Sequence, residues 1–97
     1  DEVFAYNRNT LVYAQAYALC GESEKASEVL RRVAESYGHS LRYYMKFPAK
    51  YRRSLQSETQ EAVDVLGSVK YLADAYGLTE VSTQVSDMFR AYNIQEN

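Results

Sequence analysis

Few residues in this 97-residue sequence are of a type that could carry out covalent chemistry. Cys20 could act as a nucleophile only with a base beside it, and His39 is the single histidine. Glu58, Glu61 and Asp64 could supply paired carboxylates for acid–base catalysis, but acidic side chains also stabilise the first turn of a helix. We favour the structural role and predict no catalytic residue, no metal ligand and no cofactor. An enzyme that uses Glu58, Glu61 or His39 stays an alternative, and it requires a cleft that brings them together.

The clearest chemical signal is a run of cations between Glu35 and Glu58, an interval without any acidic residue. Tyrosines are interleaved with these cations. The residues that we predict to form an interaction surface are Arg42, Tyr43, Lys46, Lys50, Tyr51, Arg52 and Arg53. Tyrosine among cations can stack on bases, lie at a membrane interface above anionic headgroups, or anchor a protein or sugar partner. The structural alternative is that the rings close a helical core while the cations face water.

Composition and net charge limit the classes of partner and of protein that fit this sequence. The net charge of −2 argues against a nucleic-acid partner for the protein as a whole. A hydrophobic fraction of 46% with 25% charged residues is typical of an ordinary globular protein. No apolar run approaches the roughly 18 residues of a membrane-spanning helix. A chain of this length makes one domain at most, so we expect a single domain over residues 1–97.

The surrounding sequence predicts helices throughout, because it has only one proline and four glycines and little alternation of period two. Apolar residues at spacings of three and four place four helices at 8–20, 23–37, 57–76 and 79–92. A short helix is expected within residues 39–55, where Pro48 interrupts it. The sequence therefore predicts an all-α fold of four to five helices.

Helix ends are predicted from capping residues and glycines. The predicted N-terminal caps are Asn7 or Asn9, Ser23, Ser57 with Gln60, and Thr79. Gly21, Gly38 and Gly77 are expected to end helices. Gly67 falls inside a helix, where glycine is unfavourable, so we expect another helix to cross closely there.

Small residues recur where the first two helices would touch. Ala14 and Ala26 would let the backbones approach, Gly21 would turn the chain, and Tyr17 and Leu30 would fill the space beside the contact. This pattern over residues 7–37 resembles one tetratricopeptide-type helical hairpin, although the early aromatic and the later proline of that motif are missing. An ordinary antiparallel helical hairpin is the alternative. The last two helices could form a second hairpin, and Cys20 is expected to be a buried thiol near a helix end.

A wider resemblance covers residues 25–77. The residues that carry it are Ala26, Val29-Leu30, Ala34, Tyr37, Leu41-x-Tyr43-Tyr44, Lys50-Tyr51, Ser54-Leu55 and the run from Glu58 and Gln60 to Val65-Leu66. With these residues, the segment is similar to the C-terminal region of a bacterial family of multi-pass membrane proteins of unknown function. That family is related to lipid-sugar-dependent protein O-mannosyltransferases.

The resemblance implies a membrane-embedded, glycosyltransferase-like body that precedes this chain and contains the catalytic acidic residues. It also implies that the chain is a soluble C-terminal appendage of an inner-membrane protein, on the periplasmic side. The sequence begins at Asp1 rather than Met, and we expect it to be a piece of a longer protein.

We therefore expect a non-catalytic interaction or scaffold module whose partner is a protein or the parent membrane domain. One alternative is contact of residues 42–53 with a membrane surface through anionic lipid headgroups. Another is a stand-alone tetratricopeptide-like adaptor that binds a peptide.

Overall fold

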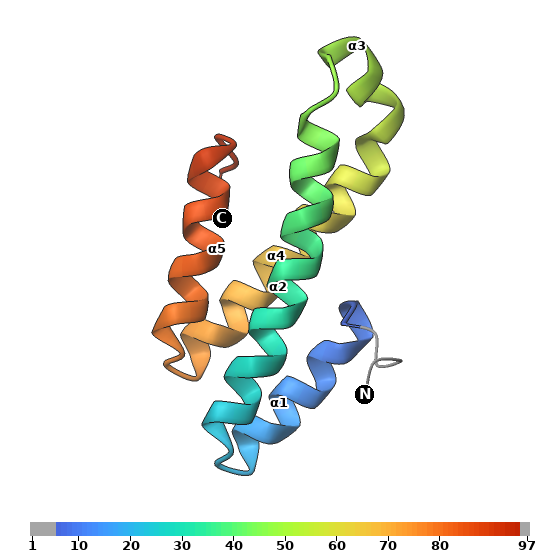
Figure 1. The fold of residues 1–97 in the computed structure, drawn as a ribbon. Coiled ribbons are helices and arrows are strands. Elements are labelled where there is room, and N and C mark those ends of the chain that lie inside the picture. Colours follow the sequence, from blue (N-terminus) through green and yellow to red (C-terminus); the bar gives the residue numbers. More distant parts are fainter. Residues whose placement is uncertain (1–5, 96–97) are drawn as a thin grey trace.

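The computed structural model describes residues 6–95, and every regular element in that range is a helix (Figure 1). The predicted all-α fold is therefore confirmed. The elements, with η for a short 3-10 helix, are η1 (Arg8–Thr10), α1 (Leu11–Leu19), α2 (Ser23–Met45), α3 (Ala49–Arg52), η2 (Arg53–Leu55), α4 (Gln56–Ala75) and α5 (Thr79–Ala91). Pro48 separates α2 from α3, as its effect on backbone geometry predicts.

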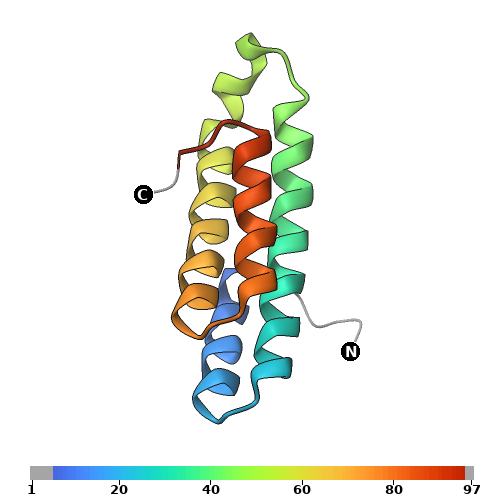
Figure 2. The same cartoon turned by 90° about the vertical axis from the view of Figure 1, so that its left-hand side faces the viewer.

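Two long helices form the centre of an elongated molecule with principal extents of 46 × 29 × 15 Å. Helices α2 and α4 run antiparallel, and α3 and η2 connect them at one end (Figure 1). Helix α1 packs against α2, whereas α5 packs against both α4 and α2. The α1–α2 and α4–α5 turns lie at the end opposite α3, as Figures 1 and 2 show. The fold is thus two hairpins joined by a long, projecting connection.

One apolar core joins all four of the longer helices. Its buried members recur at spacings of three and four on α2, α4 and α5, so each of these helices presents an apolar stripe to the others. They are Ala14, Val29, Leu30, Val33, Ala34, Leu41, Ala62, Val65, Leu66, Val69, Ala73, Val81, Val85 and Phe89. Leu30, Leu41 and Leu66 are among the largest fully buried side chains. Burial of one such side chain contributes about 1.5–3 kcal/mol to stability.

Both hairpins turn at a glycine in the left-handed backbone region. Gly21 has a φ of 80° and Gly77 a φ of 72°, values that a residue without Cβ adopts at little cost. After Gly21, the Glu22 backbone N–H donates to the Tyr17 carbonyl at 2.8 Å, and an equivalent 2.8 Å bond follows Gly77. These bonds satisfy carbonyls that the ends of α1 and α4 would otherwise leave unpaired. The prediction that both glycines end helices is confirmed.

Small residues do bring the first two helices together. Ala14 is 1% exposed and Ala26 is fully buried, and Leu30 fills the core beside them. Tyr17 was expected to pack at the same place, but 36% of its surface is exposed. The expectation of a buried Cys20 thiol is wrong, because Cys20 is exposed at the C-terminal end of α1.

Helix α2 is longer than the sequence suggested. Gly38 does not end it, and the two predicted segments on either side form one helix that continues to Met45. A Cβ atom placed on Gly38 would lie 2.7 Å from Met88 Cε, so the missing side chain makes room for α5. The close helix crossing expected at Gly67 is wrong, because a Cβ there would have no neighbour within 4 Å.

Side-chain capping is confirmed only at the start of the first helical segment. The Asn7 side chain accepts from Asn9 N–H at 2.9 Å, and Asn7 N–H donates to Thr10 Oγ1 at 2.9 Å. The wrong cap predictions are Ser23, the Ser57–Gln60 pair and Thr79. In each case the helix begins at or before the predicted cap. The residues at the actual cap positions, which make no side-chain cap hydrogen bond, are Glu22, Leu55 and Leu78.

Candidate functional site

Five cations gather where α2 turns into α4, at the projecting end of the molecule (Figure 1). This basic tip consists of Arg42, Lys46, Lys50, Arg52 and Arg53. All are exposed except Arg52, which is half-buried. Residues 36–57 contain five of the eleven cations and none of the thirteen acidic residues, so this segment carries +5 and the rest of the chain −7.

No basic-tip cation forms an ion pair with another residue in the range 6–95. Elsewhere in that range, carboxylates hold every cation except Lys25, which lies over the Tyr17 ring. These ion pairs are Arg8–Glu61, Arg31–Glu28, Arg31–Glu35, Arg32–Glu28, Lys70–Asp74 and Arg90–Asp87. Most of these join residues three or four apart on one helix, and the acid-free segment offers the basic tip no such partner. The charges of the basic tip are therefore available to an external anion.

Aromatic rings surround the basic tip in two different environments. Tyr43 is 57% exposed and Tyr51 is 53% exposed. The Tyr43 ring meets Phe47 edge-on at 5.3 Å between centroids, and Lys50 Nζ lies 5.0 Å from the Tyr51 ring centroid. Tyr44 is half-buried, like Phe47. The segment thus combines half-buried rings, Tyr44 and Phe47, with the exposed rings of Tyr43 and Tyr51.

Arg52 and Arg53 are adjacent in sequence but differ in their surroundings. Arg52 Nη1 lies 3.8 Å from Met45 Sδ, and Met45 packs against the core. Arg52 Nε is buried and has no hydrogen-bond partner among the described residues. Arg53 is exposed. Arg52 therefore attaches the turn to the core, whereas Arg53 is free to contact a partner.

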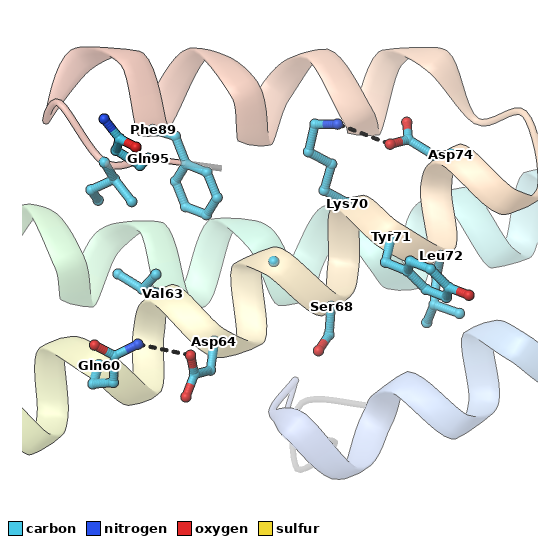
Figure 3. Close-up of a pocket in the computed structure, with 12 residues that line it drawn as sticks. Gln60, Val63, Asp64, Ser68, Lys70, Tyr71, Leu72, Asp74, Phe89 and Gln95 are labelled. Carbon is cyan, nitrogen blue, oxygen red and sulfur yellow. Dashed lines mark hydrogen bonds and ion pairs between the residues drawn. The ribbon is translucent and has the colours of Figure 1, made fainter. Parts of the chain in front are cut away.

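An open groove runs along α4 beside α5 and has a volume of about 850 Å³ (Figure 3). Its lining includes Gly67 and Tyr71, and Tyr71 is 73% exposed. Lys70 Nζ donates to Asp74 at 2.9 Å on the α5 side of the groove. The hydrogen bond from Ser82, followed by that from Lys70, lowers the pKa of the Asp74 carboxyl. The sequence reasoning missed this groove, because it interpreted Gly67 as a helix contact.

Two of the carboxylates considered for catalysis line a smaller pocket between α2 and α4, of about 250 Å³. Glu58 and Glu61 lie there with Tyr37 and Tyr44. Arg8 Nη2 donates to Glu61 Oε1 at 2.8 Å, and this bond raises the pKa of the guanidinium. Glu61 is thereby committed to linking η1 with α4.

The remaining reactive side chains lie apart. Asp64 lines the α4 groove, where its carboxylate accepts from the Gln60 side chain at 2.9 Å. His39 is exposed on α2 and does not line the pocket of Glu58. Cys20 lies next to the start of α2, and His39 follows about 24 Å further along that helix. A Cys20–His39 pair is therefore not formed.

Helix α1 has an unusual surface, because none of its nine residues is charged. Val12 is 61% exposed and Leu19 is 73% exposed, on the side of α1 away from Ala14, its buried residue. Together with Ala16, which is also exposed, they form the α1 outer face. A helix that is apolar on both sides is usually covered on both, so this face is a second candidate contact surface.

Within residues 6–95, His, Cys, Asp and Glu nowhere form a group of three that could hold a metal ion. No helix in the same range has both the length and the apolar character needed to cross a membrane. Comparison of the chain with family models, curated proteins and solved structures gives no match.

Proposed function

We propose that this chain is a non-catalytic interaction module that docks through its basic tip to an anionic partner. The observation that carries the proposal is the contrast in ion pairing. The cations of the basic tip make no ion pair with a described residue, whereas carboxylates hold nearly all the described cations elsewhere. Unpaired charge of one sign at one end of a protein attracts partners of the opposite sign and speeds their association.

The two hairpins supply the scaffold for this contact. We propose that they are tetratricopeptide-like, on the basis of the small residues at the crossing of α1 and α2. The wider resemblance supports a further proposal, that the chain is the periplasmic C-terminal appendage of a membrane-embedded, glycosyltransferase-like protein. In that setting another protein, the parent membrane domain and anionic lipid headgroups are all within reach of the basic tip.

Binding to a defined polyanion tests the proposed function. Fluorescence anisotropy with labelled poly-L-glutamate should show binding that weakens at least tenfold between about 50 and 300 mM salt, because salt screens exposed charges. The Lys46→Glu/Arg53→Glu variant should lose binding. The matched control, Lys25→Glu/Arg90→Glu, makes the same change in net charge away from the basic tip and should retain most of it.

Two results contradict the proposal. One is equal binding by the two double variants, which would show that net charge and not the basic tip governs attraction. The other is turnover of a sugar donor or an ester by the isolated chain, because the proposal assigns it no catalysis.

A peptide adaptor is the second candidate function, and the α4 groove favours it. The groove lies open beside α5, and the exposed Tyr71 ring is available to pack against a peptide side chain. A photo-crosslinking residue at Ser68 in this groove should capture a peptide partner that Gly67→Arg excludes. Identical capture by the Gly67→Arg variant would reject the groove as the binding surface.

A further inference from the structure

We infer that the anionic partner of the basic tip is a phospholipid bilayer surface, and that the elongated molecule docks on it end-on. This inference rests on the proposed function, and it adds the class of partner and the orientation of the bound molecule. Three features of the described residues support it: the separation of charge along the molecule, the shape of the projecting end, and the exposed tyrosines.

Charge is separated along the long axis. The basic tip lies at one end, and both hairpin turns lie at the other (Figures 1 and 2). Acidic residues flank these turns, with Glu22 and Glu24 at the first and Asp74 and Glu80 at the second. A negatively charged surface therefore attracts one end and repels the other. Since the molecule is 46 Å long and the Debye length is about 8 Å at physiological salt, only the attracted end feels the surface on contact.

The shape of this end suits a flat surface. The connection through α3 projects beyond α1 and α5, so it can reach a plane before the rest of the molecule does (Figure 1). Arg42 lies in the last turn of α2, and Lys46 directly follows this helix. The other three cations lie in α3 and η2, so the five are spread over the whole connection. None of them lines the α4 groove or the smaller pocket between α2 and α4. A bilayer presents its anionic headgroups across a plane, so its binding requires no groove among these cations.

The exposed rings also fit a bilayer interface. Tyr43 and Tyr51 each combine an apolar ring with a hydroxyl group, and more than half of each residue is exposed. Such side chains prefer the boundary between headgroups and hydrocarbon. Lys50 lies over the Tyr51 ring, so this cation and this ring would reach the interface together. Clustered Lys and Arg side chains near anionic lipids add attraction for each cation.

Vesicle cosedimentation with the 97-residue chain tests the partner. Phosphatidylcholine vesicles with about 30% phosphatidylglycerol should bind the chain, and pure phosphatidylcholine should bind it at least tenfold more weakly. Lys46→Glu/Arg53→Glu should weaken binding about 100-fold or more, since it reverses two charges. Lys25→Glu/Arg90→Glu should stay within about threefold of the original chain. Circular dichroism melting of each variant checks that it is folded.

A label at either end tests the orientation. Cys20 is the only cysteine and lies at the end opposite the basic tip, so a dye attached there should be unaffected by brominated lipids. With Cys20 changed to Ser, a dye on Ala49→Cys at the start of α3 should be quenched on binding. Quenching at Cys20, or equal quenching at both positions, overturns the end-on arrangement.

The outcomes separate this inference from the proposed function. Binding to poly-L-glutamate without binding to anionic vesicles overturns the lipid partner and selects an acidic protein. Vesicle binding that Lys46→Glu/Arg53→Glu retains also overturns it. Tighter binding to a short RNA than to vesicles overturns it in favour of nucleic acid. Failure to bind either poly-L-glutamate or vesicles contradicts the proposed function as well.

Discussion

Gly38 of α2 lies against the end of the Met88 side chain of α5, and a Cβ at Gly38 would come within 2.7 Å of Met88 Cε and 2.9 Å of Met88 Sδ. Gly38 is buried and lies inside α2 rather than at a helix end. Its helical backbone has no need of glycine's conformational freedom, so the residue serves packing. Helix α5 is held close to α2 at this point, which fixes the second hairpin on the first.

Substitution of Gly38 should therefore depend strongly on side-chain size. Gly38→Ala should change the free energy of unfolding by less than about 1 kcal/mol, because the gain in helix propensity offsets a small shift of the flexible Met88. Gly38→Leu should destabilise the protein by about 2–3 kcal/mol, since no movement of one side chain can accommodate it. Urea unfolding measures both values. Equal stability of the two variants would contradict the close packing.

Gly67 tests the effect of a glycine that has no close neighbour, in contrast to Gly38. It lies within α4 facing open space, and a Cβ there has no neighbour within 4 Å. Gly67→Ala should raise the free energy of unfolding by up to about 1 kcal/mol through helix propensity alone. The same urea titration measures this effect. A loss of stability would show that something occupies the space beside Gly67.

Stability should fall in acid because of two carboxylates. Hydrogen bonds from Arg31 and then Arg32 lower the pKa of Glu28, and those from Ser82 and then Lys70 lower the pKa of Asp74. A carboxyl with a lower pKa in the folded state stabilises the protein above its unfolded pKa, and this stabilisation is lost as pH falls through the folded pKa. The melting temperature should therefore decrease below about pH 4.

The acid dependence has its own control. In Glu28→Gln/Asp74→Asn these two carboxyls are gone, so the decrease in melting temperature below about pH 4 should be shallower than in the original chain. An unchanged slope would assign the acid sensitivity to other groups.

The α1 outer face should contribute little to the stability of the isolated chain. Val12→Ser/Leu19→Ser should change the free energy of unfolding by less than about 0.5 kcal/mol for each substitution, because both side chains are exposed. Sedimentation velocity at increasing concentration should show less self-association for this variant, since it removes an exposed apolar patch. A loss above about 2 kcal/mol would mean that another part of the chain covers the face.

Local pattern predicted most of the helices and the contact between α1 and α2, but not the full length of α2 or its contact with α5. The spacing of Leu30 and Val33 predicted the apolar stripe of α2, and Gly21 predicted the end of α1. The continuation of α2 past Gly38 was missed, because the decisive neighbour, Met88, lies fifty residues away in sequence. Glycine at a helix end and glycine at a helix contact have the same local signature.

The cluster of cations in the basic tip could be read from the sequence. The sequence showed an interval without acidic residues. Such an interval cannot contain ion pairs between residues three or four apart, and the structure shows no ion pair between the basic tip and a described residue. The Arg8–Glu61 pair joins residues 53 positions apart, and only the fold reveals it. The different roles of Arg52 and Arg53 were likewise hidden, because burial against Met45 depends on how the turn folds back.

The absence of acidic residues from the segment 36–57 also affects the folding of this turn. Five like charges brought together by the connection between α2 and α4 repel one another, and none of them is paired with a carboxylate of the described residues. Multivalent anions such as pyrophosphate would relieve it in the folded state more than in the extended chain. Their binding to the folded state should raise the melting temperature by mass action. The connection between α2 and α4 would then be most stable when anions from outside the protein neutralise its charges.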